Sequence, residues 1–251
     1  MIANDHSLTL SISIIVPTYH EEAHIQGFLD GLVRSLKPLQ SCEVVIVDSS
    51  TDETKANVLE YLQSTKLANF RVVSSAKGRA LQMNAGAELA LTLNPSRDNH
   101  YLLFLHADSV LPGDLLPWVK QLANETPQWG FFPVKLSARG LLYRLIEFGM
   151  NTRSQATSVA TGDQGIFVSS RMWIDVGGYN SIELMEDVEL TKRLRKLAKP
   201  YVSREAIHVS CRRWQSKGVL KTVFLMWALR LAYVVGVSPK SLAKWYRSKA
   251  R

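Results

Sequence analysis

Short apolar runs rich in β-branched residues alternate with amphipathic segments through the first half of the chain, and this alternation limits the fold more than any other feature. Four runs have the length and composition of buried strands, and helical segments separate them. The runs are "LSISIIVPTY", "CEVVIVDSS", "NFRVVSS" and "YLLFLHAD". Strands that alternate with helices form a mostly parallel sheet through right-handed crossovers. The sequence therefore predicts an α/β fold with a Rossmann-like sheet flanked by helices.

Polar or backbone-shaping residues follow each of these four runs. Pro17, Asp48, residues 77–79 and residues 106–108 all lie at predicted strand ends. In open parallel sheets, ligands bind outside the carboxyl ends of the strands. We therefore expect these four segments to line one binding site at one edge of the sheet.

His106 and Asp108 leave the fourth run together, directly after an apolar strand. A carboxylate at this point suits a hard divalent cation. Mg²⁺ takes one or two carboxylates plus substrate phosphates, and Mn²⁺ accepts the same ligands and also imidazole. The same residues also fit a plainer interpretation, in which Asp108 begins a turn and His106 is a surface residue. This motif alone does not decide between a metal site and a turn.

The second half of the chain is less regular. We expect a helix over 141–150, a loop over the polar stretch "NTRSQATSVATGDQG", a strand at "GIFVSS" and a helix that begins near Glu186. The last of these has acidic residues first and basic residues last, which matches the direction of the helix dipole. Glu186 and Asp187 are thus expected at a helix N-terminus that faces the predicted site.

An apolar segment, "GVLKTVFLMWALRLAYVVGV" (218–237), is long enough to reach across a bilayer, but it contains Lys221 and Arg230. A charge near the centre of a membrane span costs about 2.5–3.5 kcal/mol. We therefore expect a helix that packs on the protein or touches a membrane, rather than a span. The basic tail that follows carries Trp245 and Tyr246, a mixture that suits an anionic bilayer surface.

These features divide the chain into a domain over 1–214 and a C-terminal apolar helix with a basic tail over 215–251. Thirty basic residues against 22 acidic ones give the 251 residues a formal net charge of +8. That charge suits a nucleotide donor, an anionic membrane surface or nucleic acid. Cys42 and Cys211 are the only cysteines and are far apart in sequence, which indicates no disulfide framework or zinc cluster. Without an evident signal peptide, the chain is expected in the cytoplasm, with a peripheral position on the inner face of the membrane as an alternative.

Six motifs stand in a recognisable order: "IIVPTYHEE", "VVIVDSSTDET", "GRALQMNAG", "FLHADSVLP", "GGYNSIELMEDVELTKRLRK" and "RRW". Together they resemble the inverting family-2 glycosyltransferases, which use nucleotide-diphospho-sugar donors on a GT-A fold. The similarity is closest to a subgroup of short bacterial members that also carry "GRA.QMN" and "MEDV". It covers roughly residues 12–214. The resemblance implies a GT-A fold, a nucleotide-diphospho-sugar donor and a divalent cation, Mn²⁺ or Mg²⁺.

The resemblance implies a donor-binding set at the strand ends. In the family, the first strand end holds the base and ribose, an aspartate after the second strand contacts the base, and a glycine with a basic residue meets the diphosphate. The residues that match are Pro17, Thr18, Tyr19, Glu21, Asp48, Gly78, Arg79 and Asn84, with Lys77 as a weaker addition. A glycine beside a helix N-terminus is also a good anion site on physical grounds.

The family's metal motif is Asp-x-Asp, and its last aspartate matches Asp108. His106 stands at the first position, so we group it with the nucleotide-sugar-binding residues and leave open whether it or His208 binds metal.

The resemblance also implies a catalytic base in a glutamate-aspartate pair at a helix start, which matches Glu186 and Asp187. Inversion needs one carboxylate to take the proton of the acceptor hydroxyl. We assign that role to Asp187, and orientation of the acceptor to Glu186. Ser210 stands where processive members have glutamine, so processive polymerisation is not supported. Contacts to the acceptor or the diphosphate are assigned to Asp163, Gln164, Arg213 and Trp214.

The sequence thus predicts a metal-dependent inverting glycosyltransferase with a hydroxyl acceptor, and a lipid-linked acceptor is one candidate. A nucleotidyltransferase is the alternative enzyme, but it more often has a glycine-rich basic loop after the first strand, where this chain has the acidic "PTYHEE". A non-catalytic nucleic-acid or membrane binder is the alternative of another class. Its basic residues should form one face interleaved with aromatic residues. Nucleic acid is the partner that we expect least.

Overall fold

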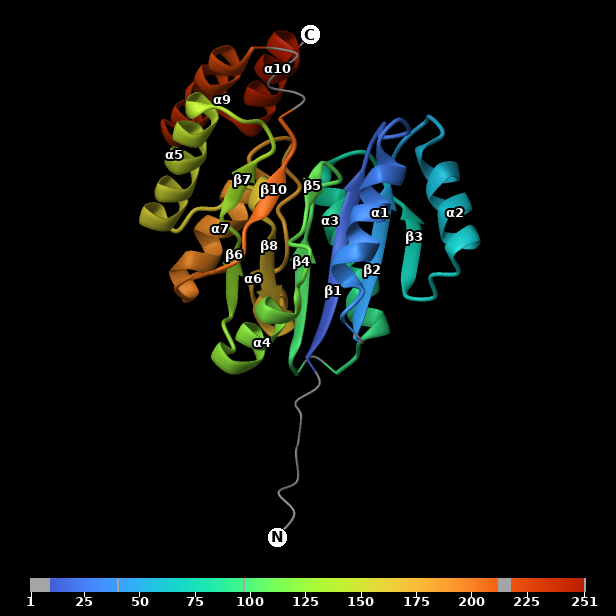
Figure 1. The fold of residues 1–251 in the computed structure, drawn as a ribbon. Helices are drawn as coiled ribbons and strands as arrows, with labels where there is room; N and C mark the ends of the chain where they lie inside the picture. Colours follow the sequence, from blue (N-terminus) through green and yellow to red (C-terminus); the bar gives the residue numbers. More distant parts are fainter. Residues whose placement is uncertain (1–9, 40, 97, 212–217, 251) are drawn as a thin grey trace.

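Helices cover both faces of a central sheet in the computed structural model, which describes residues 10–39, 41–96, 98–211 and 218–250 (Figure 1). The strands are β1 Ser11–Thr18, β2 Cys42–Asp48, β3 Phe70–Ser74, β4 His100–Phe104, β5 Ser109–Val110, β6 Trp129–Phe131, β7 Val134–Leu136, β8 Ile166–Ser169, β9 Tyr201–Val202 and β10 Ile207–Val209. The helices are α1 Ile25–Leu36, α2 Thr54–Thr65, α3 Arg79–Leu93, α4 Leu116–Glu125, α5 Leu141–Thr157, the short 3₁₀ helix η1 Gly162–Gln164, α6 Ser170–Val176, α7 Glu186–Leu197, α9 Val219–Val234 and α10 Pro239–Ala250.

The sheet confirms the predicted strand alternation. Its seven strands lie in the order β3-β2-β1-β4-β8-β6-β9, and β5, β10 and β7 form a small second sheet. β1 pairs in parallel with β2 and β4, and β2 pairs in parallel with β3, so the four predicted runs end at the same edge. Thr18 lies opposite Asp48 in this register. β8 departs from the pattern, because it is antiparallel to both β4 and β6.

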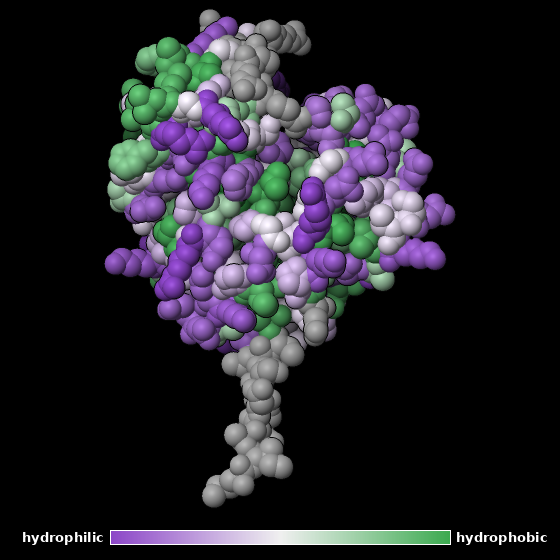
Figure 2. Space-filling view, in the orientation of Figure 1, coloured by the Kyte–Doolittle hydropathy of each residue, from purple (hydrophilic) through white to green (hydrophobic). Residues whose placement is uncertain are grey.

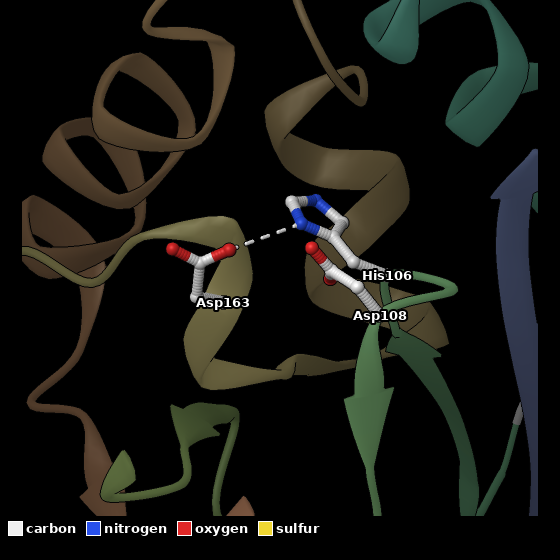
Figure 3. A group of neighbouring side chains, drawn as sticks. All are labelled: His106, Asp108 and Asp163. Atoms are coloured by element: carbon white, nitrogen blue, oxygen red, sulfur yellow. Dashed lines mark ion pairs between the residues drawn. The ribbon is translucent and has the colours of Figure 1, made fainter. Parts of the chain in front are cut away.

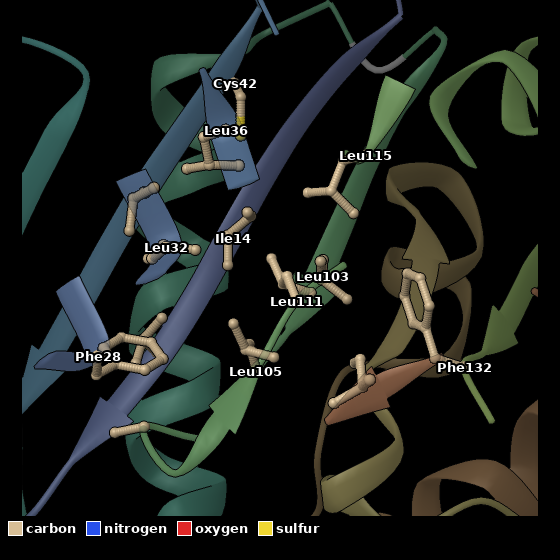
Figure 4. Close-up of a cluster of buried hydrophobic side chains, with 14 of the residues drawn as sticks. Ile14, Phe28, Leu32, Leu36, Cys42, Leu103, Leu105, Leu111, Leu115 and Phe132 are labelled. Atoms are coloured by element: carbon tan, nitrogen blue, oxygen red, sulfur yellow. The ribbon is translucent and has the colours of Figure 1, made fainter. Parts of the chain in front are cut away.

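Consecutive residues of β1 face opposite sides of the sheet, and each side has its own apolar core. Ile14 packs on the α1 side with Phe28 and Leu103 (Figure 4), whereas Ile15 packs on the α3 side with Met83. A strand buried on both faces reads as a continuous apolar run rather than an alternating one. Shortening one such buried side chain to alanine typically costs about 2–5 kcal/mol of stability.

Gly86 lets α3 approach this sheet closely. A Cβ atom at this position would lie 2.5 Å from Ile15 Cγ2 and 2.9 Å from Val47 Cγ2. The missing side chain therefore sets the distance between α3 and the strands whose ends carry the site.

The polar stretch predicted as a loop after residue 150 is largely helical, because α5 continues to Thr157. Asn151 explains the difference: its Oδ1 accepts from the backbone N–H of Val134 at 2.9 Å, and its Nδ2 donates to the Val134 carbonyl at 3.0 Å. Ser154 is buried and bonds to Gln164 Oε1 at 2.7 Å. The polar side chains of this stretch thus connect α5 to β7 of the small sheet and to η1.

The C-terminal segment forms two helices, and the basic tail is the second of them, α10. Leu229 of α9 and Leu242 of α10 are buried in one apolar cluster with Leu184, Met185 and Val188. α9 and α10 therefore pack directly against the turn that leads into α7. No helix in the described part of the chain is long and apolar enough to cross a membrane. The division into 1–214 and 215–251 stays a prediction.

Candidate active site

Side-chain hydrogen bonds join the ends of β1 and β2. The Thr18 hydroxyl donates to Asp48 Oδ1 at 2.7 Å, and the backbone N–H of Ser50 donates to Asp48 Oδ2 at 3.0 Å. Gln82 of α3, which the sequence interpretation missed, donates from Nε2 to the carbonyl oxygens of Thr18 and Val47, both at 2.8 Å. The predicted base-contacting aspartate is thus buried and fixed in orientation.

Tyr19 and Lys77 meet at the exposed edge of this site. Lys77 Nζ lies 3.8 Å from the centroid of the Tyr19 ring and donates to the Tyr19 hydroxyl at 2.6 Å. Tyr19 also stacks on His20, with ring centroids 4.0 Å apart. Gly78 follows Lys77 with φ +146, a backbone conformation that favours glycine, and begins α3. The edge therefore offers a flat ring, a cation and a helix N-terminus together.

Three possible metal ligands converge at the end of β4. His106, Asp108 and Asp163 each offer a ligand atom, and these atoms all lie within 4.8 Å of one another (Figure 3). His106 Nδ1 is 3.3 Å from Asp163 Oδ1. Among the described residues, His106 Nε2 and Asp108 Oδ1 are buried without a hydrogen-bond partner. Buried polar atoms are nearly always paired, so the two orphaned atoms fit a site that accepts a cation or a substrate group.

Burial and the neighbouring charges shift the pKa of His106 in opposite directions. Burial lowers the pKa of His106, and the Arg79 guanidinium adds to that effect, but the Asp163 and Asp108 carboxylates outweigh both. The pKa of His106 is therefore raised above its ordinary value. The sequence interpretation placed Asp163 with acceptor or diphosphate contacts, whereas the structure brings it to His106.

Glu186 and Asp187 begin α7, as the sequence predicts, and each has distinct partners. Glu186 Oε1 forms an ion pair with Arg79 Nε at 3.0 Å, and its Oε2 is buried with no hydrogen-bond partner among the described residues. Asp187 accepts from the backbone N–H groups of Gly162 and Val188, both at 2.7 Å. Burial raises the pKa of Asp187, and the neighbouring Glu186 charge raises it further, against the lowering effects of Arg79 and the two backbone donors.

Gly162 connects the metal-ligand group to this carboxylate pair. Its N–H binds Asp187, and a Cβ atom on it would lie 2.3 Å from His106 Cε1 and 2.4 Å from His106 Nε2. The absent side chain thus allows the imidazole and the Asp187 carboxylate to sit on either side of one residue.

Arg153 is a candidate site residue that the sequence interpretation missed. It lies on the part of α5 that was predicted as a loop, close enough to Asp163 and Asp187 for both carboxylates to stabilise its charge. Burial has the larger effect and lowers the pKa of Arg153. Gln164 is fully buried, and its Oε1 accepts from the Thr161 backbone N–H at 3.1 Å. Because the polar stretch has no apolar helical period, its sequence pattern offered no signal that placed Arg153 on a helix.

Asn84 is hydrogen-bonded to the backbone of Tyr179. Its Nδ2 donates to the Tyr179 carbonyl at 2.8 Å, and its Oδ1 accepts from the Tyr179 N–H at 2.9 Å. Asn84 thus ties α3 to the segment between α6 and α7. Its contact with a donor stays a prediction.

Of the other predicted residues, Pro17 and Glu21 lie at the end of β1. Pro17 is in the β1 ladder opposite Val47, and the Glu21 N–H donates to Thr54 Oγ1 at 2.9 Å. His208 is exposed on β10 and is not part of the three-ligand group. Arg213 and Trp214 lie outside the described residues.

Sequence comparisons identify relatives of this chain. Residues 13–173 match the family model described as glycosyl transferase family 2. Poly(ribitol-phosphate) beta-N-acetylglucosaminyltransferase TarS of Staphylococcus aureus (strain Mu50) is 28% identical over 108 residues, which cover 43% of this chain and 18% of TarS. An uncharacterized glycosyltransferase of Synechocystis sp. is 28% identical over 85 residues, or 33% of this chain and 27% of that protein. The matched segments are thus less than a third of either relative.

Solved structures with the same fold include two glycosyltransferases. S. aureus TarS 1-349 in complex with UDP superposes with a TM-score of 0.61 at 21% identity, over 84% of this chain and 64% of that one. Mannosyltransferase PcManGT from Pyrobaculum calidifontis in complex with GDP-Man and Mn²⁺ superposes with a TM-score of 0.59 at 18% identity, over 88% and 60%. At these identities the likeness shows the fold, and the GT-A prediction is confirmed. Because the family model matches more than half of its length, the chain belongs to glycosyl transferase family 2.

Proposed function

We propose that this chain moves a sugar from a nucleoside diphosphate to an acceptor hydroxyl, with inversion at the anomeric carbon and dependence on a divalent cation. The main support for the proposal is the junction at Gly162, by which we mean the place where this residue separates the His106 ring from the Asp187 carboxylate. An aspartate with a raised pKa is held there beside the group His106, Asp108 and Asp163. Inverting transfer needs a base for the acceptor and a means of stabilising the leaving diphosphate, and the junction supports both.

Asp187 is the proposed base. It takes the proton of the acceptor hydroxyl while the acceptor oxygen bonds to the anomeric carbon, on the side opposite the diphosphate. The bond from that carbon to the diphosphate oxygen breaks, and its electron pair leaves with the nucleoside diphosphate. A raised pKa makes Asp187 a stronger base than an ordinary carboxylate. Glu186 is proposed to orient the acceptor by accepting from a second hydroxyl, and its Oε2, without a hydrogen-bond partner among the described residues, supports this.

The donor is proposed to lie along the ends of β1, β2 and β4. Thr18, Tyr19 and Asp48 hold the base and ribose, while Arg79 and the N-terminus of α3 bind the diphosphate. The TarS complex with UDP and the PcManGT complex with GDP-Man support a uridine or guanosine nucleotide. A panel of UDP-sugars and GDP-sugars, scored by thermal shift, tests this, because a bound donor stabilises the folded state.

A divalent cation is proposed to bind Asp108, with His106 and Asp163 as the further candidate ligands. The two buried orphaned atoms, Asp108 Oδ1 and His106 Nε2, support this assignment. Carboxylate with imidazole suits Mn²⁺, and carboxylates with substrate phosphates suit Mg²⁺. When bound, such a cation neutralises charge that develops on the leaving diphosphate.

Asp108→Asn tests the cation site. We expect the variant to lose Mn²⁺-dependent donor turnover by at least about tenfold. Losing an outer-shell partner of a metal site already costs about 10-fold to 100-fold, and Asp108 is proposed as a direct ligand. Its melting temperature should be close to the wild-type value, because one carboxylate at the sheet edge contributes little packing. Asp114→Asn is the matched control, since Asp114 accepts from the Leu116 N–H on an exposed turn away from the group. Unchanged Mn²⁺-dependent turnover in folded Asp108→Asn protein would remove Asp108 from the metal role.

We propose that the acceptor hydroxyl belongs to a lipid-linked molecule at the cytoplasmic face of a membrane. Two observations support this. α9 and α10 pack against the turn that carries the carboxylate pair, and α9 leaves large apolar side chains exposed. Cys42 and Cys211 are buried free thiols, which agrees with a reducing compartment.

A further inference from the structure

Helix α9 has two apolar faces, of which one is packed. Leu225, Leu229, Ala232 and Tyr233 pack in the cluster beside the carboxylate pair. The other face is a stripe at helical spacing whose side chains are between 56% and 71% exposed. Its members are Leu220, Phe224, Trp227, Leu231 and Val234. A helix that packed on this protein alone would place polar residues along that stripe.

Helix α5 carries a second exposed stripe at the same end of the molecule. Leu141, Leu145 and Phe148, spaced four and three residues apart, are 64% to 88% exposed. Figure 2 shows apolar side chains gathered over the end formed by α5 and α9. Monomeric soluble proteins rarely expose contiguous apolar patches above a few hundred Å², and larger ones mark contact surfaces. We refer to these two stripes as the apolar face.

The charge of the C-terminal segment indicates what covers this face. Residues 206–251 contain ten of the thirty basic residues and none of the 22 acidic ones, so the rest of the chain has two more acidic than basic residues. Six of these ten basic residues lie in α9 and α10, and neither helix contains an acidic residue. Lys221, Lys240, Lys244 and Arg247 are exposed on these helices.

This charge argues against a second copy of the chain as the occupant, because two such basic segments would repel each other. It favours an anionic surface. Apolar and aromatic side chains on one face of a helix, with lysine and arginine around them, are typical of helices that lie in the headgroup region of anionic bilayers. We infer that the apolar face docks on an anionic lipid bilayer, with Phe224 and Trp227 among the inserted side chains.

Docking in this way would place the carboxylate pair beside the bilayer. The cluster under α9 and α10 includes Leu184 and Val188, which flank Glu186 and Asp187 in sequence. Against the lowering effect of burial, Tyr246 of α10 is among the groups that raise the pKa of Arg79, after Glu186. The Asp187 carboxylate is among the groups that raise the pKa of Tyr233 on α9, after burial of that ring. The inference of docking rests on the surface alone, whereas a lipid-linked acceptor at that surface rests on the proposed function.

Vesicle flotation with the full chain tests the docking. We expect binding to vesicles of phosphatidylcholine with phosphatidylglycerol, weak binding to phosphatidylcholine alone, and release as salt is raised. Phe224→Ser/Trp227→Ser should weaken binding by at least about tenfold, given the apolar area that the two side chains would bury. Lys240→Glu/Lys244→Glu should weaken binding to the anionic vesicles specifically. Leu59→Ser is the matched control, because Leu59 is 49% exposed on α2, away from the apolar face (Figure 1).

Two further measurements on the same preparations distinguish the possible results. Donor turnover reports whether the site is folded and active, and light scattering reports whether the protein is a monomer or a dimer. Unchanged donor turnover in Phe224→Ser/Trp227→Ser shows that the site is still folded. Vesicle binding without any donor turnover in the wild type would overturn the proposed function and leave the docking in place. Vesicle binding that is absent, or that Phe224→Ser/Trp227→Ser leaves unchanged, would overturn the docking. A wild-type dimer that this variant abolishes, without vesicle binding, would overturn it in favour of a second copy.

Discussion

Arg79→Gln should destabilise the protein through the carboxylate that it leaves behind. Glu186 is 2% exposed, its Oε1 is 3.0 Å from Arg79 Nε, and its Oε2 has no hydrogen-bond partner among the described residues. Removing one member of a buried ion pair typically costs about 3–5 kcal/mol. Arg79 is 44% exposed, so solvent already screens the pair, and we expect about 1–3 kcal/mol. For a chain of this length, that corresponds to a fall in Tm of about 2–12 °C.

Urea unfolding of four proteins tests this reasoning: the wild type, Arg79→Gln, Glu186→Gln and the double variant. Glu186→Gln removes the buried charge and leaves a half-exposed guanidinium, so it should cost less than about 1 kcal/mol. The double variant should be more stable than Arg79→Gln alone, with a coupling energy of at least about 1 kcal/mol. If the losses of unfolding free energy in the two single variants simply add in the double variant, the unpaired Glu186 carboxylate is not what destabilises Arg79→Gln. The Arg79–Glu186 ion pair would then not contribute to stability.

Three further predictions concern the chemistry. Asp187→Asn should lower transfer by about 10² to 10⁴ with donor affinity nearly unchanged; a parallel loss of donor binding by calorimetry would contradict the base assignment. Because the pKa of Asp187 is raised, kcat should fall on acidification at a higher pH than an ordinary aspartate would impose, and a pH profile with no such limb would argue for another base. Gly162→Ala should push the His106 ring aside at a cost of about 1–3 kcal/mol and weaken Mn²⁺-dependent turnover. Gly113→Ala, where a Cβ atom meets nothing within 4 Å, should do neither.

Local pattern was sufficient to predict the four parallel strands and the edge at which their polar ends meet. Doubly buried parallel strands have a continuous apolar sequence, and their polar ends are visible as interruptions at Asp48 and His106. The start of α7 at Glu186 could also be predicted, because acidic residues at a helix N-terminus have a physical cause. These features depend on neighbours in sequence.

Features set by distant residues could not be predicted in the same way. The helical stretch after residue 150 is polar because Asn151 and Ser154 bond to other elements, and such bonds leave no apolar periodicity. The ion pair of Arg79 with Glu186 joins residues more than a hundred positions apart. The approach of Asp163 to His106 depends on how η1 packs at the end of β4. Sequence pattern reports which residues are buried, but not which polar residues meet.

The packing of α9 and α10 under the Glu186–Asp187 turn also has a consequence for biosynthesis. The sheet, both of its main cores and the ends of β1, β2 and β4 use residues that leave the ribosome before α9 does. The turn that carries the carboxylate pair receives its apolar support last, from Leu229 and Leu242. A growing chain can therefore fold the strands of the proposed donor site while the turn that carries Glu186 and Asp187 is still unsupported. If the proposed roles hold, competence for donor binding should precede competence for transfer during translation.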